Sequence, residues 1–501
     1  MQEKIKQLRT YLGEVMDLAA TAALLGWDQQ TYMPSGSNQG RAMQLATINR
    51  LTHEKFTSDE LGRALEELKS GVEDLDPNSD DARLIIQVAK EFDKQLKVPN
   101  AYVAEFARIT ALSHQTWEKA RQESDFSIFQ ADLEKVIEMR QEYANFFQPY
   151  DHIYDPLLDD FEAGMKTADV KKVFEDLRPR QVALINAIVE SPHQVDDSVL
   201  HQEFDESAQW AFGEEVIKAF GYDFNRGRQD KAVHPFTTSF GIDDVRITTR
   251  LTPDFFNPAL FGTLHEAGHG MYEQGISKQL ARTPIADGAS LGIHESQSRM
   301  WENLVGRGRP FWVAYFPRLQ EYFPEALNGA KIDDFYRAIN KVERSFIRVD
   351  ADEATYNLHI MVRFDLETAL ITGELSAVDL PEAWNQKFEE YLGITPPDDA
   401  QGVLQDIHWS FGGFGYFATY SLGNLIAAML WDVIQKDLPD LESQFEKAQF
   451  GDLLEWLQVN IHVHGAKYEP MELLKMVTGS GLDADPYMRY LKSKFGEIYK
   501  L

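Results

Sequence analysis

The pentapeptide His265-Glu266-Ala267-Gly268-His269 lies near the middle of this 501-residue chain and has the histidine spacing of a helix. On an α-helix, two residues four apart lie about 40° from each other and one turn apart, so both rings can reach one ion. Glu266 then lies beside the open coordination position, where a carboxylate can take a proton from water. The pentapeptide therefore predicts a helix that carries two metal ligands and a general base.

Helical spacing of hydrophobic residues recurs along the rest of the chain. Leu61, Leu65 and Leu68 recur at spacings of four and three, which marks one face of a helix. Four longer segments show the same habit: residues 101–122, 168–190, 330–347 and 377–392. Asp-Pro and Ser-Pro pairs predict turns between helices at residues 76–77, 155–156 and 191–192. We therefore predict a mainly α fold.

One short segment ahead of the histidines has the pattern of a strand. Residues 244–250, Asp-Val-Arg-Ile-Thr-Thr-Arg, alternate and are rich in β-branched side chains, which predicts a small β hairpin beside the active-site helix. No fixed-period repeat, low-complexity tract or Gly/Ser linker divides the chain. We therefore predict one domain over residues 1–501, with two lobes. A helical portion of roughly 1–225 would cover a catalytic portion of roughly 226–501.

Charge and cysteine content limit the partners and the compartment. The chain carries 49 Lys and Arg against 80 Asp and Glu, a formal net charge of −31, so we expect neither nucleic acid nor membrane as a partner. No stretch approaches the roughly 20 apolar residues that cross a bilayer. Residues 1–15 have the pattern of an amphipathic helix rather than of a signal peptide. The lack of cysteine excludes thiol catalysis and zinc–thiolate sites and is compatible with the reducing cytoplasm, where we expect the protein.

A third metal ligand must come from outside the pentapeptide, because a catalytic site uses three protein ligands and a water. Glu273 continues the histidine face but lies about 12 Å along the helix axis from His265, which makes it a poor ligand. Glycines and a proline between 275 and 292 break the chain, and a new helical stretch is predicted from Ile293 to Gly306. Glu295, early in that stretch, can point back across the turn and is the predicted third ligand.

Other side chains of this region remain alternatives. His294 is the rival ligand, and Glu295 would then support a ligand instead of binding the ion. Asp287 and Glu302 are weaker alternatives, and Glu302 is suited to accept the N–H of a ligand histidine. The set of His265, His269 and Glu295 suits one zinc ion per chain, although cobalt or manganese can occupy the same ligands. Histidines that only cap or hydrogen-bond within a helix are the alternative to a metal site.

Longer motifs extend the pattern over nearly the whole chain. In order, they are residues 25–34 (LGWDQQTYMP), His234-Pro235-Phe236, Asp244-x-Arg246-x-Thr248, the pentapeptide, His294-Glu295-Ser296-Gln297, residues 347–352 (IRVDAD), residues 402–409 (GVLQDIHW) and residues 461–465 (IHVHG). With these motifs the chain resembles the carboxypeptidase Taq family and departs from the family pattern at none of them. Several long motifs in one order are far more specific than one pentapeptide.

The resemblance implies both a fold and an activity. The implied fold is an almost all-helical, two-lobed body with a deep groove, similar to angiotensin-converting enzyme and neurolysin. The implied activity is removal of single residues of broad preference from peptides with a free C-terminus. His265, His269 and Glu295 would be the ligands and Glu266 the catalytic base. The segment with Asp244, Arg246 and Thr248 would close the groove and limit substrate length, and a homodimer is expected.

Two further roles need polar residues near the metal. Donors must stabilise the tetrahedral intermediate, and His408 and Tyr420 are candidates because aromatic residues and glycines cluster between 409 and 416. The choice of Tyr420 rests partly on analogy with the oxyanion tyrosines of related helical peptidases. For each, an ordinary buried hydrogen-bonding side chain is the alternative.

An exopeptidase must also bind a terminal carboxylate, which arginine does with two parallel hydrogen bonds. Arg348 is the predicted anchor, because an arginine among apolar neighbours is costly to bury without purpose. A structural ion pair with Asp350 or Asp352 is the alternative, and Arg246 is the second candidate anchor.

The remaining motif residues are expected to line the substrate pocket: His234, Pro235, Phe236, Gln405 and Asp406. No second ligand lies near His234 in the sequence, which argues against a metal-binding role for it. We interpret His462 and His464 as structural or pocket-lining residues.

Two other functions compete with a carboxypeptidase. An oligoendopeptidase of the same helical type would share the metal ligands but have an open groove and no carboxylate anchor. A metal-binding or peptide-carrier protein without activity would tolerate the loss of Glu266, and a structural metal site would fill its fourth position with protein.

Overall fold

Helices account for 67% of the computed structural model, which describes residues 1–501. The helices before the sheet are α1 (Gln2–Thr31), α2 (Asn38–Phe56), α3 (Asp59–Lys69), α4 (Asp80–Leu96), α5 (Asn100–Glu123), α6 (Ser127–Asn145), α7 (Asp155–Asp159), α8 (Thr167–Glu190) and α9 (Glu206–Phe220). Those after it are α10 (Asn257–Gly275), α11 (Leu291–Arg299), α12 (Arg309–Tyr322), α13 (Ile332–Ile339), α14 (Tyr356–Thr372), α15 (Leu380–Leu392), α16 (Ala418–Asp437), α17 (Leu441–Phe445), α18 (Gly451–Asn460), α19 (Pro470–Thr478) and α20 (Asp485–Tyr499). The predicted mainly α fold is confirmed.

Most of the predicted helices are present, with ends shifted by a few residues. The structure differs from the prediction at the end of one helix and at one predicted turn. The predicted helix over 330–347 ends at Ile339, because the side-chain amide of Asn340 donates to Tyr336 O at 2.9 Å and to Arg307 O at 3.1 Å. Asp155-Pro156, predicted as a turn, begins the short helix α7 instead. Proline is tolerated in the first turn of a helix, where its missing N–H would have no partner.

The sheet contains three strands: β1 (Gly227–Lys231), β2 (Thr237–Ser239) and β3 (Val245–Thr249). β2 and β3 are antiparallel and form the predicted hairpin, with Thr237 opposite Ile247. β1 pairs with the other edge of β3 in parallel. The sequence gives no sign of β1, since its residues Gly-Arg-Gln-Asp-Lys lack apolar alternation. β3 and β2 both pack against α10, so the sheet lies directly beside the histidine helix.

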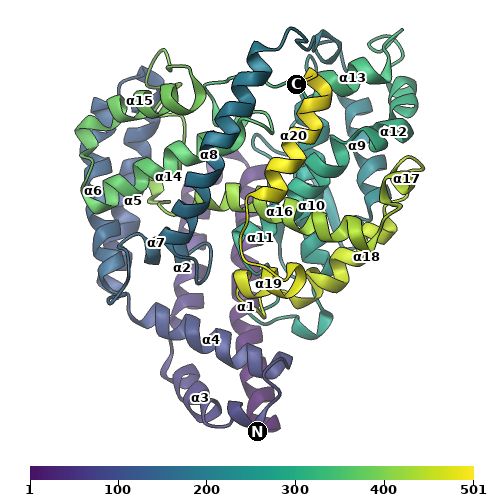
Figure 1. The fold of residues 1–501 in the computed structure, drawn as a ribbon. Helices are drawn as coiled ribbons and strands as arrows, with labels where there is room; N and C mark the ends of the chain where they lie inside the picture. The colour runs from purple at the N-terminus through teal and green to yellow at the C-terminus, as the bar shows by residue number, and fades with distance from the viewer.

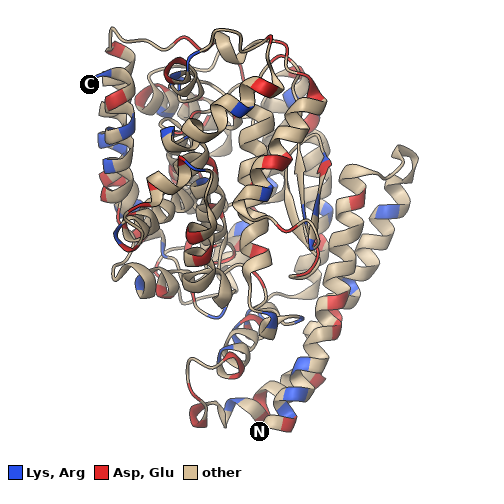
Figure 2. Ribbon diagram, turned by 90° about the vertical axis from the view of Figure 1, so that its right-hand side faces the viewer, with Lys and Arg blue, Asp and Glu red and all other residues tan.

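The helices gather on two sides of a central helix (Figure 1). α5, α6, α14 and α15 lie on one side, while α9, α10, α12 and α18 lie on the other, and α16 runs between them. α1 and α2 form a pair along one edge, and α1 contacts β2 (Figure 2). Acidic residues occur along most of the helices in that view. None of the helices combines the length and apolar character needed to cross a bilayer.

Two hydrophobic clusters hold the structure together. The large one contains 100 buried residues and runs from α5 to the C-terminal helix α20. The small one contains 17 residues, contributed mainly by α1, α3 and α4, and includes Ile276, Leu280 and Ile285 from the segment that follows α10. The start of α1 is therefore packed against the loop that leads to α11. The division of one domain into portions 1–225 and 226–501 remains a prediction.

Candidate metal centre

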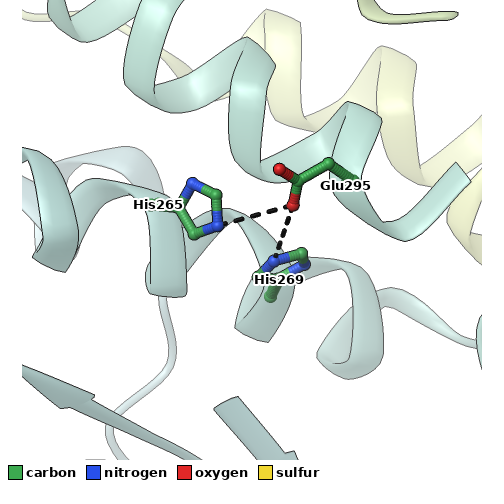
Figure 3. A group of neighbouring side chains, drawn as sticks. All are labelled: His265, His269 and Glu295. Atoms are coloured by element: carbon green, nitrogen blue, oxygen red, sulfur yellow. Dashed lines mark ion pairs between the residues drawn. The ribbon is translucent and has the colours of Figure 1, made fainter. Parts of the chain in front are cut away.

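His265 and His269 on α10 and Glu295 on α11 point toward one another (Figure 3). The Nε2 atoms of His265 and His269 lie 3.5 Å and 3.4 Å from Glu295 Oε2. The ligand atoms of the three residues lie within 4.8 Å of one another. Two imidazole nitrogens and a carboxylate oxygen that converge in this way fit a divalent ion such as zinc.

The second ring nitrogen of each histidine has a partner. His265 Nδ1 lies 3.0 Å from Glu302 Oε2. His269 Nδ1 lies 2.5 Å from His294 Nδ1, and His294 Nε2 lies 2.7 Å from Glu273 Oε1. Such partners fix the ring orientation and leave Nε2 free for an ion. His294 and Glu273, weighed above as a rival and a poor ligand, are thus placed behind His269.

The charge around Glu295 is balanced by an arginine that sequence reasoning missed. Arg299 Nε donates to Glu295 Oε1 at 2.7 Å, and its Nη1 donates to Glu302 Oε2 at 3.3 Å. Burial alone would raise the pKa of Glu295, but Arg299 and His265 outweigh it and hold that pKa well below its ordinary value. Burial is likewise outweighed at Glu302, whose pKa falls to about 2. Both carboxyls are therefore charged. The signal for Arg299 was its spacing, four residues after Glu295 and three before Glu302.

Glu266 is buried beside the sheet, with 7% of its surface exposed. The hydroxyl of Thr237 on β2 lies 2.7 Å from Glu266 Oε2 and 3.0 Å from the Glu266 carbonyl oxygen. Burial raises the pKa of the Glu266 carboxyl above its ordinary value. Thr237 was not predicted, although it directly follows the His234-Pro235-Phe236 motif. The hairpin therefore orients one oxygen of this carboxylate and leaves Oε1 without a protein donor.

A groove of about 1020 Å³ opens onto these residues. Its wall is drawn from distant segments, because α1 contributes residues between Met16 and Ala23 and α16 contributes Thr419 and Tyr420. Pro235, Phe236 and Asp244 line it, together with His265, Glu266, His269 and Glu295. Of the other residues predicted to bind substrate, His234 is exposed and lies outside this lining.

The predicted groove-closing segment forms a braced unit. Arg246 donates to both oxygens of Asp244 at 2.9 Å. Its guanidinium also stacks on Trp27 of α1, with 4.4 Å to the ring centroid. Thr248 Oγ1 accepts the N–H of Phe236 at 2.8 Å and so ties β3 to the groove wall. The hairpin and α1 are thereby joined beside the site. The positive charge of Arg246 is balanced by Asp244 within this contact.

Arg348 lies in a buried cluster near Tyr420. Its Nε and Nη2 donate to Asp406 Oδ1 at 3.0 Å and 2.8 Å, so the alternative ion pairs with Asp350 and Asp352 are absent. Gln405 Oε1 accepts the backbone N–H of Arg348 at 2.9 Å. Arg363, fully buried, pairs with the other oxygen of Asp406. Gln405 and Asp406 therefore hold Arg348 instead of lining the groove.

The rings of His408 and Tyr420 both lie near that of Phe417. The ring of His408 packs on that of Phe417 with centroids 4.4 Å apart, and its Nδ1 has no hydrogen-bond partner. Burial lowers the pKa of His408 to about 4, so its ring is neutral at pH 7. Tyr420 lines the groove, and the guanidinium of Arg348 lies 5.2 Å from its ring centroid. His408 is thus one layer behind the groove wall.

The two histidines of the last motif differ in their surroundings. His462 is fully buried, and its Nε2 lies 2.9 Å from Gln297 Oε1, which joins the C-terminal region to α11. His464 is partly exposed and packs edge-on against Tyr468. Neither lines the groove or joins the metal cluster.

Proteins of known family are similar to this chain over nearly its whole length. The model of the family described as carboxypeptidase Taq (M32) metallopeptidase matches residues 7–495. Thermostable carboxypeptidase 1 of Thermus thermophilus is 41% identical over 503 residues, which cover 99% of this chain and 98% of that protein. Carboxypeptidase 1 of Bacillus subtilis is 37% identical over 503 residues, which cover 99% of this chain and 100% of that protein.

Solved structures share the fold as well. The M32 carboxypeptidase of Deinococcus radiodurans R1 has a TM-score of 0.97 and 40% identity, with 100% of both chains covered. Metallocarboxypeptidase 1 of Trypanosoma cruzi has a TM-score of 0.95 and 30% identity, with 99% of this chain and 100% of that chain covered.

A helical body with two histidines, a glutamate ligand candidate and a buried carboxylate on one groove defines a metallopeptidase. The relatives narrow this class to enzymes that act at peptide C-termini. The chain belongs to the carboxypeptidase Taq (M32) metallopeptidase family. It is a carboxypeptidase, and its family implies a divalent metal ion and peptide substrates.

Proposed function

We propose that this carboxypeptidase releases single amino acids, with broad side-chain preference, from peptides with a free C-terminus. The observation that carries the proposal is the convergence of His265, His269 and Glu295 beside the buried Glu266 on one groove. The three ligand candidates would hold one divalent ion, zinc first, with cobalt or manganese as alternatives. When bound, such an ion lowers the pKa of water toward neutrality and polarises the scissile carbonyl.

Glu266 would act as general base and then as general acid. Thr237 occupies Oε2, so Oε1 is the atom that would take the proton from the attacking water. Oε1 would then deliver that proton to the nitrogen of the leaving amine. The carboxylate lies beside the sheet with 7% of the residue surface exposed, which limits its contact with bulk water.

We propose Tyr420 as a hydrogen-bond donor to the developing oxyanion, and we propose that His408 supports this role from behind the groove wall. Tyr420 lines the groove together with Tyr416, and the centroids of the two rings lie 5.4 Å apart. His408 has a ring nitrogen without a partner. Donors of this kind act on charge that exists only in the transition state, and they are worth most where water is excluded.

Arg348 is proposed as the anchor of the substrate carboxylate. Arg348 and Arg363 share the carboxylate of Asp406, so Asp406 alone does not balance the positive charge of this buried cluster. That charge lies behind Tyr420, which lines the groove, and Arg348 itself is not part of the groove lining. A terminal carboxylate is the anion that would balance it, and Asp406 and Gln405 would keep the guanidinium in position.

The braced unit of Asp244, Arg246 and Thr248 is proposed to limit the length of substrate beyond the cleaved bond. Its stack on Trp27 joins the hairpin to α1 at the groove. Pro235 and Phe236 would contact the substrate, and His234 would shape the end of this wall.

Timed digestion of one peptide with a free and with an amidated C-terminus tests the proposal. We expect stepwise release of single residues from the free peptide and at least a hundredfold slower release from the amide. Internal cleavage of both peptides at similar rates would instead identify an oligoendopeptidase. Metal analysis of the same preparation identifies the ion, and loss of activity with a chelator followed by recovery with zinc is expected.

The assembly and location are also proposed. A homodimer is expected from the family, and sedimentation equilibrium at several protein concentrations tests it. The cysteine-free chain fits a reducing compartment, and we propose a cytoplasmic location that cell fractionation can check.

A further inference from the structure

α11 is packed between α10 on one side and α16 on the other, and its most extensive contacts are with α16. α10 carries His265 and His269, α11 carries Glu295, and α16 carries Tyr420. The relative positions of these three helices therefore decide whether the side chains in Figure 3 converge. At both contacts the neighbouring helix presents a glycine.

The contact between α10 and α11 is made at Gly268. A Cβ atom added there would lie 2.7 Å from Ser298 Cα and 2.8 Å from the carbonyl oxygen of Gln297. Both of these are atoms of the α11 backbone, which cannot move away without moving the helix. Gly268 lies in the chain between the two histidines, so any increase in this distance separates them from Glu295.

The contact between α11 and α16 is made at Gly423. A Cβ atom added there would lie 2.5 Å from Glu295 Cγ and 2.6 Å from Glu295 Cβ. Gly423 therefore touches the side chain of a proposed metal ligand. It also lies three residues after Tyr420 on the same helix, so the same contact sets how near Tyr420 comes to Glu295.

Helix formation does not explain either glycine. Glycine is among the poorest residues in a helix interior, and alanine is the best. Both positions lie within long helices and have ordinary helical backbone, so a positive φ does not require glycine either. Close approach of the helices is the remaining physical reason.

We propose that Gly268 and Gly423 are positioning residues of the metal centre. Gly268 sets the distance from Glu295 to the two histidines, and Gly423 sets the position of the Glu295 side chain and its distance to Tyr420. The proposal rests on the proposed function, because it takes His265, His269 and Glu295 as the ligands.

Metal affinity of the Gly423→Ala variant tests the proposal. The zinc dissociation constant is measured by competition with a chromogenic chelator, alongside kcat, KM and the Tm of the metal-free protein. We expect zinc binding to weaken at least tenfold and kcat to fall at least tenfold, with KM changed less than threefold. Gly268→Ala is expected to weaken zinc binding at least as much, because its contact is with backbone.

Gly496→Ala on α20 is the matched control. Gly496 also lies inside a helix, but a Cβ atom there meets nothing within 4 Å. This variant should bind zinc like the wild type and have an equal or higher Tm, because alanine favours the helix. It separates the effect of close approach from the general effect of replacing a helical glycine.

Wild-type zinc affinity and kcat in both Gly423→Ala and Gly268→Ala would overturn the proposal while leaving the proposed function intact. Failure of the proposed function has a different signature, since the wild type would then bind no zinc, or Glu295→Ala would bind it as tightly as the wild type. If Gly423→Ala alone is poorly folded, the fall in Tm that it causes is measured a second time in a protein that also carries Glu295→Gly, which removes the contacting Cβ and Cγ atoms. The fall in Tm should be smaller in the Glu295→Gly protein than in the wild type. An equal fall in both would contradict a contact between Gly423 and the Glu295 side chain.

Discussion

At the scale of single residues, each histidine of the proposed metal site has one ring nitrogen toward Glu295 and the other toward a hydrogen-bond partner. The partner of His265 is Glu302. The partner of His269 is His294, whose other ring nitrogen contacts Glu273. These contacts orient both rings so that Nε2 of each faces Glu295. The carboxylate of Glu266, the proposed general base, is also held in place, because the hydroxyl of Thr237 contacts one of its oxygens.

Replacing Glu266 with Gln should separate binding of metal from turnover. The variant keeps the shape of the side chain but cannot take a proton. We expect kcat to fall about 10²- to 10⁴-fold. Metal content, measured by mass spectrometry of the dialysed protein, should stay at the wild-type value. A metal-loaded variant with wild-type kcat would contradict the assignment of the base.

Replacing Arg348 with Lys tests the carboxylate anchor. Lysine keeps the charge but lacks the planar pair of donors, so KM for a free-ended peptide should rise about tenfold or more. Metal content should not change, because Arg348 makes no hydrogen bond to His265, His269 or Glu295. An unchanged KM would reject the role.

At the scale of elements, the metal centre depends on how α11 continues. Residues Met300–Gly306 form a π-helix, which follows α11 without a break. The wider turn places Glu302 against His265 while Arg299 reaches both Glu295 and Glu302. π-helices are rare, occur mostly as short segments within α-helices and are often found at functional sites. This segment therefore belongs to the support of the ligands.

Replacing Glu302 with Gln should weaken the metal site without removing a ligand. The neutral amide accepts a weaker hydrogen bond from His265 and leaves Arg299 less well balanced. We expect the zinc dissociation constant to rise about 10- to 100-fold. Chelator competition measures it, with Glu73→Gln as a control at an exposed glutamate outside any ion pair. Equal affinity in both variants would contradict the supporting role.

For the candidate metal site, the sequence predicted the ligand residues better than it predicted the secondary structure around them. The spacing of His265 and His269 and the break before Ile293 favoured Glu295 and left His294 as a rival. The structure brings His265, His269 and Glu295 together. The π-helix and Asn340, which ends α13, left no periodic signal, because one turn of unusual geometry hardly changes hydrophobic spacing. Strand β1 was missed because pairing with β3, and not its own polar sequence, makes it a strand.

Partners that come from distant segments were the least predictable. The motif predicted Asp406 as a pocket-lining residue, whereas its pairing with Arg348 and Arg363 needs a contact across more than 40 residues of chain. The contact between Thr237 and Glu266 depends on the packing of the hairpin against α10, which the sequence does not specify. Tertiary packing decides such contacts, and one sequence carries little information about it.

At the scale of the whole molecule, several carboxyl groups are buried without a cation. Glu162 is fully buried and accepts hydrogen bonds from Ser290 Oγ at 2.6 Å and Gly292 N at 2.9 Å, at the start of α11. Glu367 is also fully buried and accepts from Trp409 Nε1 at 2.7 Å and Gly415 N at 3.0 Å. The hydrogen bonds of Glu162 hold the start of α11, and those of Glu367 hold the segment that precedes α16. Burial, only partly opposed by these donors, raises the pKa of each to about 7.

This burial predicts a pH dependence of stability that Glu162→Gln should remove. With a folded pKa of about 7 and an ordinary value of 4.5, the folded state holds the proton of Glu162 more tightly than the unfolded state. The contribution of Glu162 to the free energy of unfolding is therefore greatest below about pH 4.5 and falls as the pH rises through 7, by an amount on the order of 3 kcal/mol.

Denaturant unfolding of the metal-free proteins between pH 5 and 8 measures the difference. The stability of wild type relative to Glu162→Gln should decrease as the pH rises. Other titrating groups are common to both proteins and cancel in the difference. A difference that stays constant over this range, or grows with pH, would contradict the prediction, and Glu73→Gln serves as the control for loss of one charge.

The walls of the groove come from positions 16 to 420 of the chain, from α1 through α10 and α11 to α16. During synthesis, α1 leaves the ribosome first, but the helix that carries Thr419 and Tyr420 is made only after most of the protein exists. An unfinished chain therefore has no complete groove in which to cleave a peptide. The order in which the walls are made therefore delays hydrolysis of peptides until the chain is nearly complete.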